Sequence, residues 1–280
     1  MRDKPVAHSK PSFFDGKGEI HEMDAVELVG QLPNDSVDLV IFDSAYESLE
    51  KWRATGTTTR LKHSKGSSND WFETFPNAGY FPLFGHLYRV MKPGAHLYMF
   101  CDEETRDMVC CGFSPQTGEF IEKSVGGAKM TNPSSAPIKS FKVWKSIVWD
   151  KVHKGLGYHY PAQHEFILFA EKVEKKGKHR QLNTNKVGDV ISVPRLKGNR
   201  FYPTTKPAPL IWTLINESSQ PGDVVLDPFM GGGTVPVLCK MMNRYFIAGD
   251  ISTKSIEYTL TGLKDPKLFV KNHTHETLSK

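Results

Sequence analysis

Residues 224–250 contain two short apolar runs, and a glycine-rich turn followed by a helical pattern lies between them. The runs cover residues 224–227 and 245–250, and both have the length of buried strands. The turn holds three consecutive glycines at positions 231–233, and apolar residues at helical spacing follow through residue 241. A strand, a helix and a second strand in this order predict a parallel β-α-β unit, which is typical of α/β proteins.

The rest of the chain repeats this alternation of strands and helices. Further strands are predicted at residues 37–42, 96–101, 146–149 and 165–170, and further helices near residues 24–32, 80–91 and 207–215. The run 37–42 carries one charge among apolar residues, which is typical of a strand that is buried on both faces. We therefore expect an α/β fold, with a mostly parallel twisted sheet and helices on both of its faces.

The composition is that of an ordinary folded protein. Of the 280 residues, 39% are hydrophobic and 24% are charged, which argues against a disordered or collagen-like chain. No apolar run approaches the roughly 18 residues of a membrane helix, and residues 1–11 lack the apolar core of a secretory signal. We expect a cytoplasmic protein without membrane contact.

The cysteines (Cys101, Cys110, Cys111 and Cys239) form no C-x-x-C pair, so we expect buried, reduced thiols and no metal site.

Three segments show little apolar periodicity and are rich in small, polar or basic residues. They cover residues 51–75, 113–145 and 171–200. Long segments of this kind in compact domains are usually functional or disordered. We predict a single domain over residues 1–280, into which these three segments are inserted.

The glycine-rich turn has the composition of a ligand-binding loop at the start of a helix, where backbone N–H groups can approach a ligand closely. It is not a nucleoside triphosphate loop, because no Lys follows the glycines. The dinucleotide pattern G-x-G-x-x-G fails as well. Asp250 ends the next predicted strand, where a carboxylate can hold ribose hydroxyls. Taken alone, the turn leaves open a purely structural role.

A second predicted strand also ends in polar residues. Asp43, Ser44, Ala45 and Tyr46 follow the strand 37–42 and offer a carboxylate, two small residues and an aromatic ring. A strand that ends in Asp is common, so this block alone is weak support for a site.

Together, and in this order, the two blocks resemble those of the β-class DNA amino-methyltransferases, in which the motif order is circularly permuted. In that family a catalytic block D-P-P-Y precedes a cofactor block D-P-F-x-G-x-G-T. Residues 43–46 are similar to the first block and residues 227–234 to the second. Residues 89–94, 147–151, 164–168 and 204–207 are similar to further family blocks, so the resemblance extends from about residue 20 to residue 258.

The resemblance implies a Rossmann-like fold and transfer of a methyl group from S-adenosylmethionine to the N6 amine of adenine in DNA, after base flipping. Asp43 and the backbone carbonyl of Ser44 would accept the two N–H groups of the amine, and Tyr46 would offer a face to the base. Ser44 and Ala45 stand where the family usually has two prolines. The carbonyl is retained, but neither residue fixes φ as proline does, which puts the rigidity of the turn in doubt.

The resemblance also implies a cofactor site. Its expected residues are Asp227, Pro228, Phe229, Gly231, Gly233 and Thr234 for the methionine end, Asp250 for the ribose, and Asp24 with Ala25 for the adenine. Asp24 is equally interpreted as the N-cap of a helix, with Glu27 completing a capping box. Lys206 either meets the cofactor carboxylate or packs on the surface.

The expected partner is duplex DNA. Net charge is +5, and basic residues concentrate at 51–65, 139–154 and 172–200. Each cluster alone is more typical of a solvated surface, but the family implies DNA contact. A homodimer, the recognised sequence and a restriction-modification, host or phage role are left open.

Several alternatives compete with adenine methylation. The family usually has Ser in place of Asp43 when it methylates N4 of cytosine, so Asp43 favours adenine. Enzymes acting on protein amides have Asn before Pro-Pro-Tyr and the opposite motif order, and enzymes acting on RNA form a further alternative. An inactive nucleic-acid-binding module of the same fold is disfavoured, because Asp43, Tyr46 and the glycine block are present.

Overall fold

A computed structural model describes residues 12–14, 16–52, 73–111, 113–114, 119–120, 136–155, 159–173, 179–184, 186–196, 202 and 204–274. Its strands are β1 (Ser12–Phe14), β2 (Gly18–Glu22), β3 (Val37–Phe42), β4 (Met91–Cys101), β5 (Phe113–Ser114), β6 (Glu119–Phe120), β7 (Lys142–Asp150), β8 (His164–Glu171), β9 (Val190–Ser192), β10 (Val224–Asp227) and β11 (Tyr245–Asp250). Its α-helices are α1 (Ala25–Gln31), α2 (Tyr80–Val90), α3 (Glu103–Cys111), α4 (Ala208–Ser218), α5 (Thr234–Met241), α6 (Thr253–Lys264) and α7 (Pro266–Asn272), and η1 (Glu47–Trp52) and η2 (Asn77–Gly79) are 3-10 helices.

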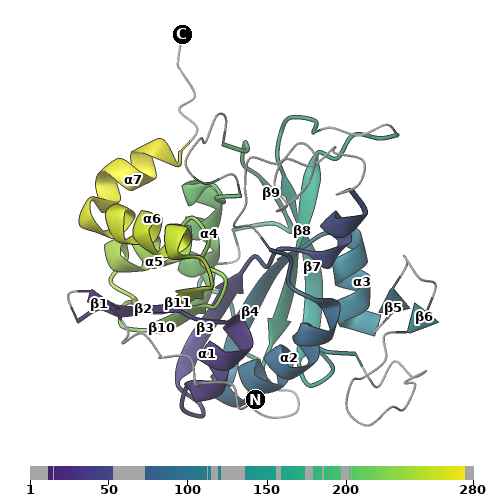
Figure 1. Cartoon of the computed structure of the whole chain (residues 1–280), viewed down its shortest axis with the longest axis horizontal. Coiled ribbons are helices and arrows are strands. Elements are labelled where there is room, and N and C mark those ends of the chain that lie inside the picture. Colours follow the sequence, from purple (N-terminus) through teal and green to yellow (C-terminus); the bar gives the residue numbers. More distant parts are fainter. Residues whose placement is uncertain are drawn as a thin grey trace, which may run out of the picture.

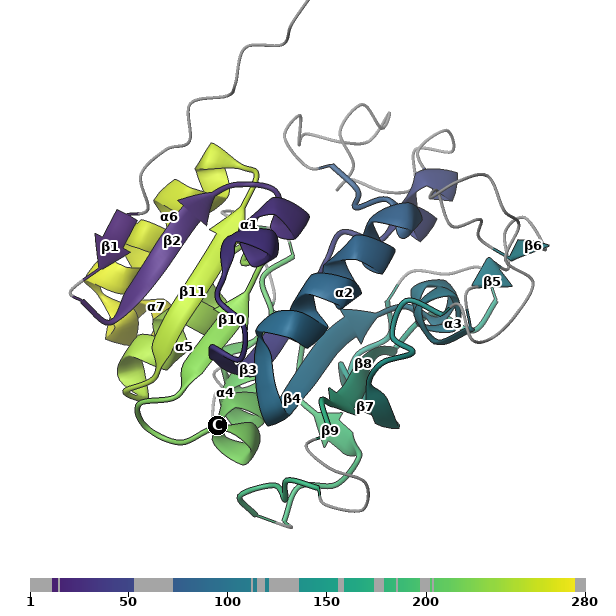
Figure 2. The same cartoon turned by 90° about the horizontal axis from the view of Figure 1, so that it is seen from below.

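Nine of the described strands form one sheet in the order β1-β2-β11-β10-β3-β4-β8-β7-β9. The five strands from β2 to β4 are mutually parallel, so their carboxyl ends lie at the same edge. Figure 2 shows the arrows of β2 and β4 pointing to that edge. β8 runs antiparallel to both of its neighbours, β4 and β7. The sheet is therefore mixed, with a parallel centre as predicted.

Helices cover both faces of the sheet (Figures 1 and 2). Leu39 and Ile41 of β3 belong to the apolar cluster that includes α4 to α7, whereas Val40 and Phe42 belong to the cluster that includes α1 to α3. Side chains alternate between the faces of a strand, so a strand that is covered on both sides needs apolar residues at successive positions. This is the physical reason for the continuous apolar run at residues 37–42.

The chain leaves the centre of the sheet in two directions. From β3 it continues through α2 to β4, and from β10 it continues through α5 to β11 on the other side. β3 and β10 are adjacent, so the gap between their carboxyl ends is a topological switch point, where open α/β sheets bind their ligands. Asp43 follows β3 and Asp227 ends β10. The topology therefore brings the two predicted blocks together.

Local signals explain where several helices begin. Asp24 is the N-cap of α1 and accepts the N–H groups of Val26 and Glu27, at 2.8 and 3.2 Å. Pro207 precedes α4, and its fixed φ suits the start of a helix. Gly233 precedes α5 with a φ of +75°, a conformation that favours glycine. The N-cap interpretation of Asp24 is thus confirmed.

Strands 37–42, 224–227 and 245–250 have the predicted bounds, and the helices near residues 24–32, 80–91 and 207–215 are present as α1, α2 and α4. Three predicted strands have other bounds in the structure, and one of them, β8, extends one residue beyond 165–170 at each end. β4 begins at Met91 and not at residue 96, so Pro93 and Gly94 lie within the strand. β7 begins at Lys142, so the predicted insertion 113–145 ends inside a strand. Helices α3, α6 and α7 and strands β1, β2, β5, β6 and β9 were not predicted.

Two further expectations concern exposure. Cys101 and Cys239 are buried as expected, but Cys110 is half-buried and Cys111, the last residue of α3, is exposed. Among the helices of the described residues, none is both long and apolar enough to cross a membrane. Most of the predicted insertion at 51–75 lies outside the described residues.

Candidate active site

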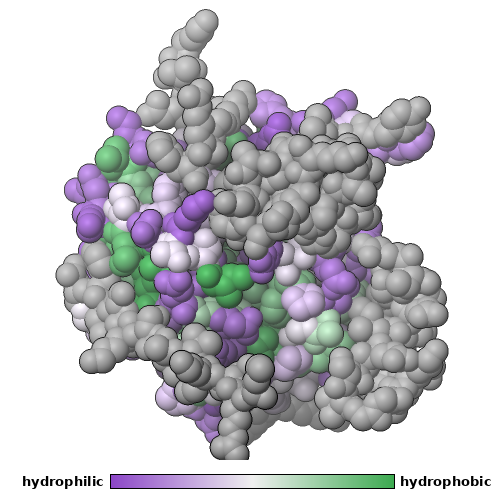
Figure 3. All heavy atoms as spheres, in the orientation of Figure 1, coloured by the Kyte–Doolittle hydropathy of each residue, from purple (hydrophilic) through white to green (hydrophobic). Residues whose placement is uncertain are grey.

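A cavity of about 710 Å³ lies at the carboxyl edge of the parallel strands. Its volume is within the roughly 300–1,000 Å³ of typical ligand pockets. On the face seen in Figure 3, hydrophobic residues lie near the middle and are bordered by hydrophilic ones. The cavity is lined by residues of the two predicted blocks and of segments between them, among them Asp24, Ala25, Asp43, Ser44, Ala45, Tyr46, Glu165, Lys206, Pro228, Phe229, Gly231 and Asp250.

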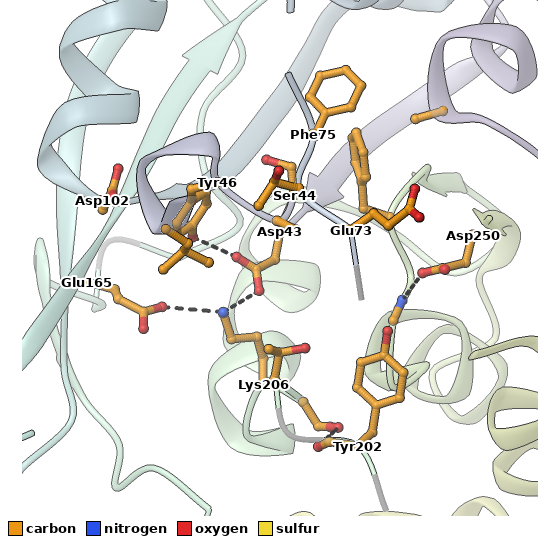
Figure 4. A pocket seen from close by; sticks show the side chains of 18 of the residues that line it. Asp43, Ser44, Tyr46, Glu73, Phe75, Asp102, Glu165, Tyr202, Lys206 and Asp250 are labelled. Carbon is orange, nitrogen blue, oxygen red and sulfur yellow. Dashed lines mark hydrogen bonds and ion pairs between the residues drawn. The ribbon is translucent and has the colours of Figure 1, made fainter. Parts of the chain in front are cut away.

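Asp250 forms one end of the cavity, where its carboxylate is held by the backbone (Figure 4). The N–H of Gly231 donates to one of its oxygens at 3.0 Å, and the N–H of Ser252 donates to the other at 2.9 Å. Burial raises the pKa of the Asp250 carboxyl, and the two backbone hydrogen bonds oppose this shift. A carboxylate oxygen can accept more than one hydrogen bond, so Asp250 can also accept ligand hydroxyls.

Asp227 is buried beneath the glycine turn. It accepts the N–H of Phe229 at 3.1 Å, and burial raises its pKa well above the ordinary value. It does not line the main cavity but a small adjoining hollow of about 40 Å³, together with Asp43 and Lys206. This hollow connects the cofactor block with the catalytic block.

Gly231 and Gly233, at the two ends of the glycine run, have different environments. Gly231 has a φ of +47°, and a Cβ on it would lie 3.1 Å from the ring of Tyr202. Gly233 faces α6, where a Cβ would clash with the hydroxyl oxygen of Thr259. Gly231 lines the cavity, whereas Gly233 lines neither the cavity nor the hollow. The position of Gly233 therefore supports a packing role in place of the predicted ligand contact.

Asp43 forms the other end of the cavity (Figure 4). Its carboxylate accepts the hydroxyl of Tyr46 at 2.7 Å and forms an ion pair with Lys206. Burial, and next the charge of Asp43, raise the pKa of Tyr46 well above its ordinary value. The phenol therefore stays protonated and donates to the carboxylate. Both oxygens of Asp43 have a protein partner in this structure.

The turn that follows Asp43 is fixed without prolines. The hydroxyl of Ser44 lies 2.6 Å from the hydroxyl of Tyr80, and both groups are buried. The N–H of Phe75 donates to the carbonyl of Ala45 at 2.6 Å. One side chain and one backbone bond thus restrain the two positions at which the sequence raised doubt. Because the Ala45 carbonyl has a partner, the Ser44 carbonyl is the better candidate for a ligand contact.

Lys206 does not pack on the surface, so that alternative is wrong. Its side chain is 13% exposed, and its ammonium pairs with Asp43 and, at 3.3 Å, with Glu165. The ammonium also lies over the rings of Phe100 and Trp149, 5.0 and 5.8 Å from their centroids. Thr234 fixes the backbone here, because its hydroxyl donates to the Lys206 carbonyl at 3.0 Å.

A sequence profile of DNA methylases matches residues 37–261, which is most of the chain. The match includes the blocks at both ends of the cavity. The chain belongs to the N6/N4 DNA methylase family. This DNA methylase is thus an S-adenosylmethionine-dependent amino-methyltransferase, which acts on N6 of adenine or N4 of cytosine.

The relatives of this DNA methylase include the type II methyltransferase M.HpaI of Haemophilus parainfluenzae. The two proteins are 26% identical over 254 residues, which cover 83% of this chain and 70% of M.HpaI. The structure of the M1.HpyAVI–SAM complex matches with a TM-score of 0.55 at 21% identity, over 87% of this chain and 98% of that one. The cytosine-N4-specific PvuII DNA methyltransferase matches with a TM-score of 0.56 at 13% identity, over 87% and 85%. At these identities the structural matches support the fold alone.

Sequence reasoning missed several residues that line the cavity of the DNA methylase, namely Glu165, Lys151, Trp149, Tyr202 and Phe75. Glu165 offered a signal, because it is a charged residue at the start of the buried strand β8. Trp149 lies near the end of the neighbouring strand β7, and Lys151 directly follows that strand. The antiparallel strands β7 and β8 can be assigned to the cavity only when it is known that β8 pairs with β4 in the sheet.

Proposed function

We propose that this DNA methylase transfers a methyl group to the N6 amine of adenine in duplex DNA. The observation that carries the proposal is the Asp43 carboxylate, which lines the cavity at the carboxyl end of a central parallel strand. The family usually has Ser at this position when it methylates cytosine. The cytosine-N4-specific PvuII DNA methyltransferase shares the fold, so the fold itself does not select the base.

The residues at the Asp250 end fit S-adenosylmethionine. Asp250 can accept ribose hydroxyls, and Asp24 and Ala25 line the same cavity on the side where the adenine is expected. Gly231 has no side chain and so leaves the wall beside Tyr202 open, where a Cβ would nearly fill the gap. Phe229 lines the cavity and packs edge-on against Phe75, 4.9 Å between centroids, so it offers a fixed apolar wall.

The residues at the Asp43 end fit the acceptor amine. S-adenosylmethionine supplies a methyl group on a positively charged sulfur. The Asp43 carboxylate and the Ser44 carbonyl accept the two N–H groups of the amine and aim its nitrogen, so positioning supplies much of the acceleration. As the new N–C bond forms and the S–C bond breaks, Asp43 stabilises the positive charge that develops on the amine and accepts the proton that it loses. Tyr46 leaves the carboxylate and presents its ring to the flipped base.

DNA contact is proposed for the three basic segments, two of which contribute described residues to the wall of the cavity. Lys151, in the segment 139–154, and Arg195, in the segment 172–200, line the cavity itself. The segment 51–65 begins within η1, whose last two residues are Lys51 and Trp52. We further propose that residues 1–280 work as one catalytic domain, in the cytoplasm, and a homodimer stays a prediction for light scattering to test.

Mass analysis of nucleosides tests the proposal directly. Unmethylated, amplified bacterial DNA is incubated with the protein and S-adenosylmethionine, digested and analysed for methylated adenine and cytosine. We expect N6-methyladenine. N4-methylcytosine in its place would overturn the choice of base, and the absence of any methylated nucleoside would favour an inactive DNA-binding module.

A further inference from the structure

Four charged side chains form an alternating chain along the wall of the cavity, and we call these four residues the charge chain. Asp43 pairs with Lys206, Lys206 pairs with Glu165 at 3.3 Å, and Glu165 pairs with Lys151 at 3.2 Å. Each side chain is at most 21% exposed. Figure 4 shows the first three of them at the side of the cavity opposite Asp250 and Tyr202.

The charge chain is built from four separate elements. Asp43 follows β3, Glu165 is the second residue of β8, Lys151 follows β7 and Lys206 precedes α4. The Lys206 ammonium is the central cation, because both carboxylates lie within ion-pair distance of it. Its position over two aromatic rings adds a favourable environment for a cation.

The ion pair with Lys206 conflicts with the proposed reaction. The target amine has to donate to the Asp43 carboxylate, yet Tyr46 and Lys206 already occupy its two oxygens. The methyl donor also carries a positive charge, so an ammonium beside the reacting atoms is unfavourable. A partly buried ammonium leaves a carboxylate readily only if another anion takes it over.

We propose that Glu165 is a positioning residue that takes over the Lys206 ammonium when the target amine docks on Asp43. The inference rests on the proposed function, because it assigns Asp43 to the amine. Glu165 already contacts the ammonium, so the transfer needs only a small movement of the flexible lysine side chain. Lys151 neutralises the other oxygen of Glu165 throughout. The exchange frees Asp43 and keeps the ammonium paired.

A cycle of variants tests this exchange by methyl transfer. Single-turnover transfer of labelled methyl groups to duplex DNA is measured at saturating cofactor for Glu165→Gln, Lys206→Met and the double variant. Glu165→Gln leaves the ammonium on Asp43, so we expect a loss of about ten- to a hundredfold, as for one charged hydrogen bond. The double variant has no ammonium to block Asp43, so it should be faster than Glu165→Gln alone.

This recovery separates a positioning role from a structural one. If Glu165 only supported the fold, a second buried substitution would leave the rate equal or lower, and that result would overturn the inference. An unchanged rate in Glu165→Gln would do the same. Glu165→Asp keeps the charge and should retain more activity than Glu165→Gln. Glu19→Gln is the matched control, since it makes the same substitution on β2 next to His21, at 3.1 Å, far along the sheet.

A second readout needs no turnover. In thermal unfolding of the free protein, Asp43→Asn or Glu165→Gln alone leaves one carboxylate on the Lys206 ammonium. The double variant Asp43→Asn/Glu165→Gln removes both carboxylates, so its loss in melting temperature should exceed the sum of the two single losses. Additive losses would overturn the inference. Labelled methyl groups are counted on any base, whereas mass analysis identifies the base, so a failure of the proposed adenine specificity is seen separately.

Discussion

The two ends of the cavity hold their carboxylates in different ways. Asp250, and Asp227 in the adjoining hollow, accept backbone N–H groups from residues nearby in the sequence or on the adjoining turn. Asp43 is held by side chains, namely the phenol of Tyr46 and the ammonium of Lys206. A backbone donor stays in place, whereas a side chain can turn away. The cofactor end is therefore a fixed cradle, and the reaction end can exchange partners when the base arrives.

The largest effect is expected from filling the fixed cradle. Gly231→Asp places a Cβ against Tyr202, forces a side chain into a φ of +47° and adds a charge beside Asp250. We expect affinity for S-adenosylmethionine to fall about a hundredfold or more, which is about 3 kcal/mol, in calorimetric titration. The control is Gly222→Asp, at another positive-φ glycine that has no atom within 4 Å of an added Cβ. Unchanged affinity in Gly231→Asp would contradict the cofactor assignment.

A smaller effect is expected from the exchangeable end. Tyr46→Ala removes a stacking face worth about 1–3 kcal/mol per base, so DNA methylation should slow about 5- to 150-fold. Tyr46→Phe keeps the ring, loses only the hydroxyl that leaves Asp43 during the reaction, and should retain much of the rate. Tyr245→Ala is the control, because Tyr245 begins β11 and Asp250, which lines the cavity, ends it. If Tyr46→Phe is as slow as Tyr46→Ala, the hydroxyl group and not the aromatic ring is the important feature of Tyr46.

The next effect concerns the turn between the two ends. Ser44→Ala leaves the buried hydroxyl of Tyr80 without its 2.6 Å partner, which costs about 1–3 kcal/mol of unfolding free energy. Adding Tyr80→Phe removes the orphaned hydroxyl, so the double variant should recover part of this loss. Denaturant unfolding measures both. A double variant that is less stable than Ser44→Ala would show that the hydroxyl pair does not fix the turn.

The smallest effect is a dependence of stability on pH. Burial raises the pKa of Asp227, so the folded state binds this proton more tightly than the unfolded state. Stability therefore falls as pH rises from the unfolded pKa to the folded pKa, and the loss is complete above the latter. Asp227→Asn removes the ionisation. In the absence of cofactor it should melt higher than the unmodified protein at neutral pH, and the difference should disappear below about pH 3.9.

The same contrast explains what the sequence could predict. The glycine turn, Asp227 and Asp250 form a local unit of strand, turn, helix and strand, and the strands have the predicted bounds. Neighbours in the sequence determine such a unit. The bonds at the reaction end join distant residues, and Lys206 and Asp43 lie 163 positions apart. Their pairing depends on the order of strands in the sheet, which apolar periodicity does not reveal.

The antiparallel part of the sheet shows the same limit. β7 is exposed or half-buried at all positions but Trp149, so its early residues carry little apolar signal and were assigned to an insertion. Glu165 was recognised as part of a strand but not as part of a site, because its role follows from the contact with Lys206. Local patterns thus predicted the elements, and packing of β8 beside β4 placed Glu165 in the cavity.

One measurement tests the central claim, that Asp43 acts on the amine and not on the cofactor. Asp43→Ala and the unmodified protein are compared in single-turnover methyl transfer to duplex DNA, and the affinity of each for S-adenosylmethionine is measured by calorimetry. We expect the rate to fall ten- to a hundredfold or more, because a charged acceptor and the alignment of the amine are lost. This fall corresponds to a rise of at least about 1.5–3 kcal/mol in the activation free energy. The affinity should stay unchanged. A normal rate of N6-methyladenine formation by Asp43→Ala would place the reaction elsewhere in the molecule.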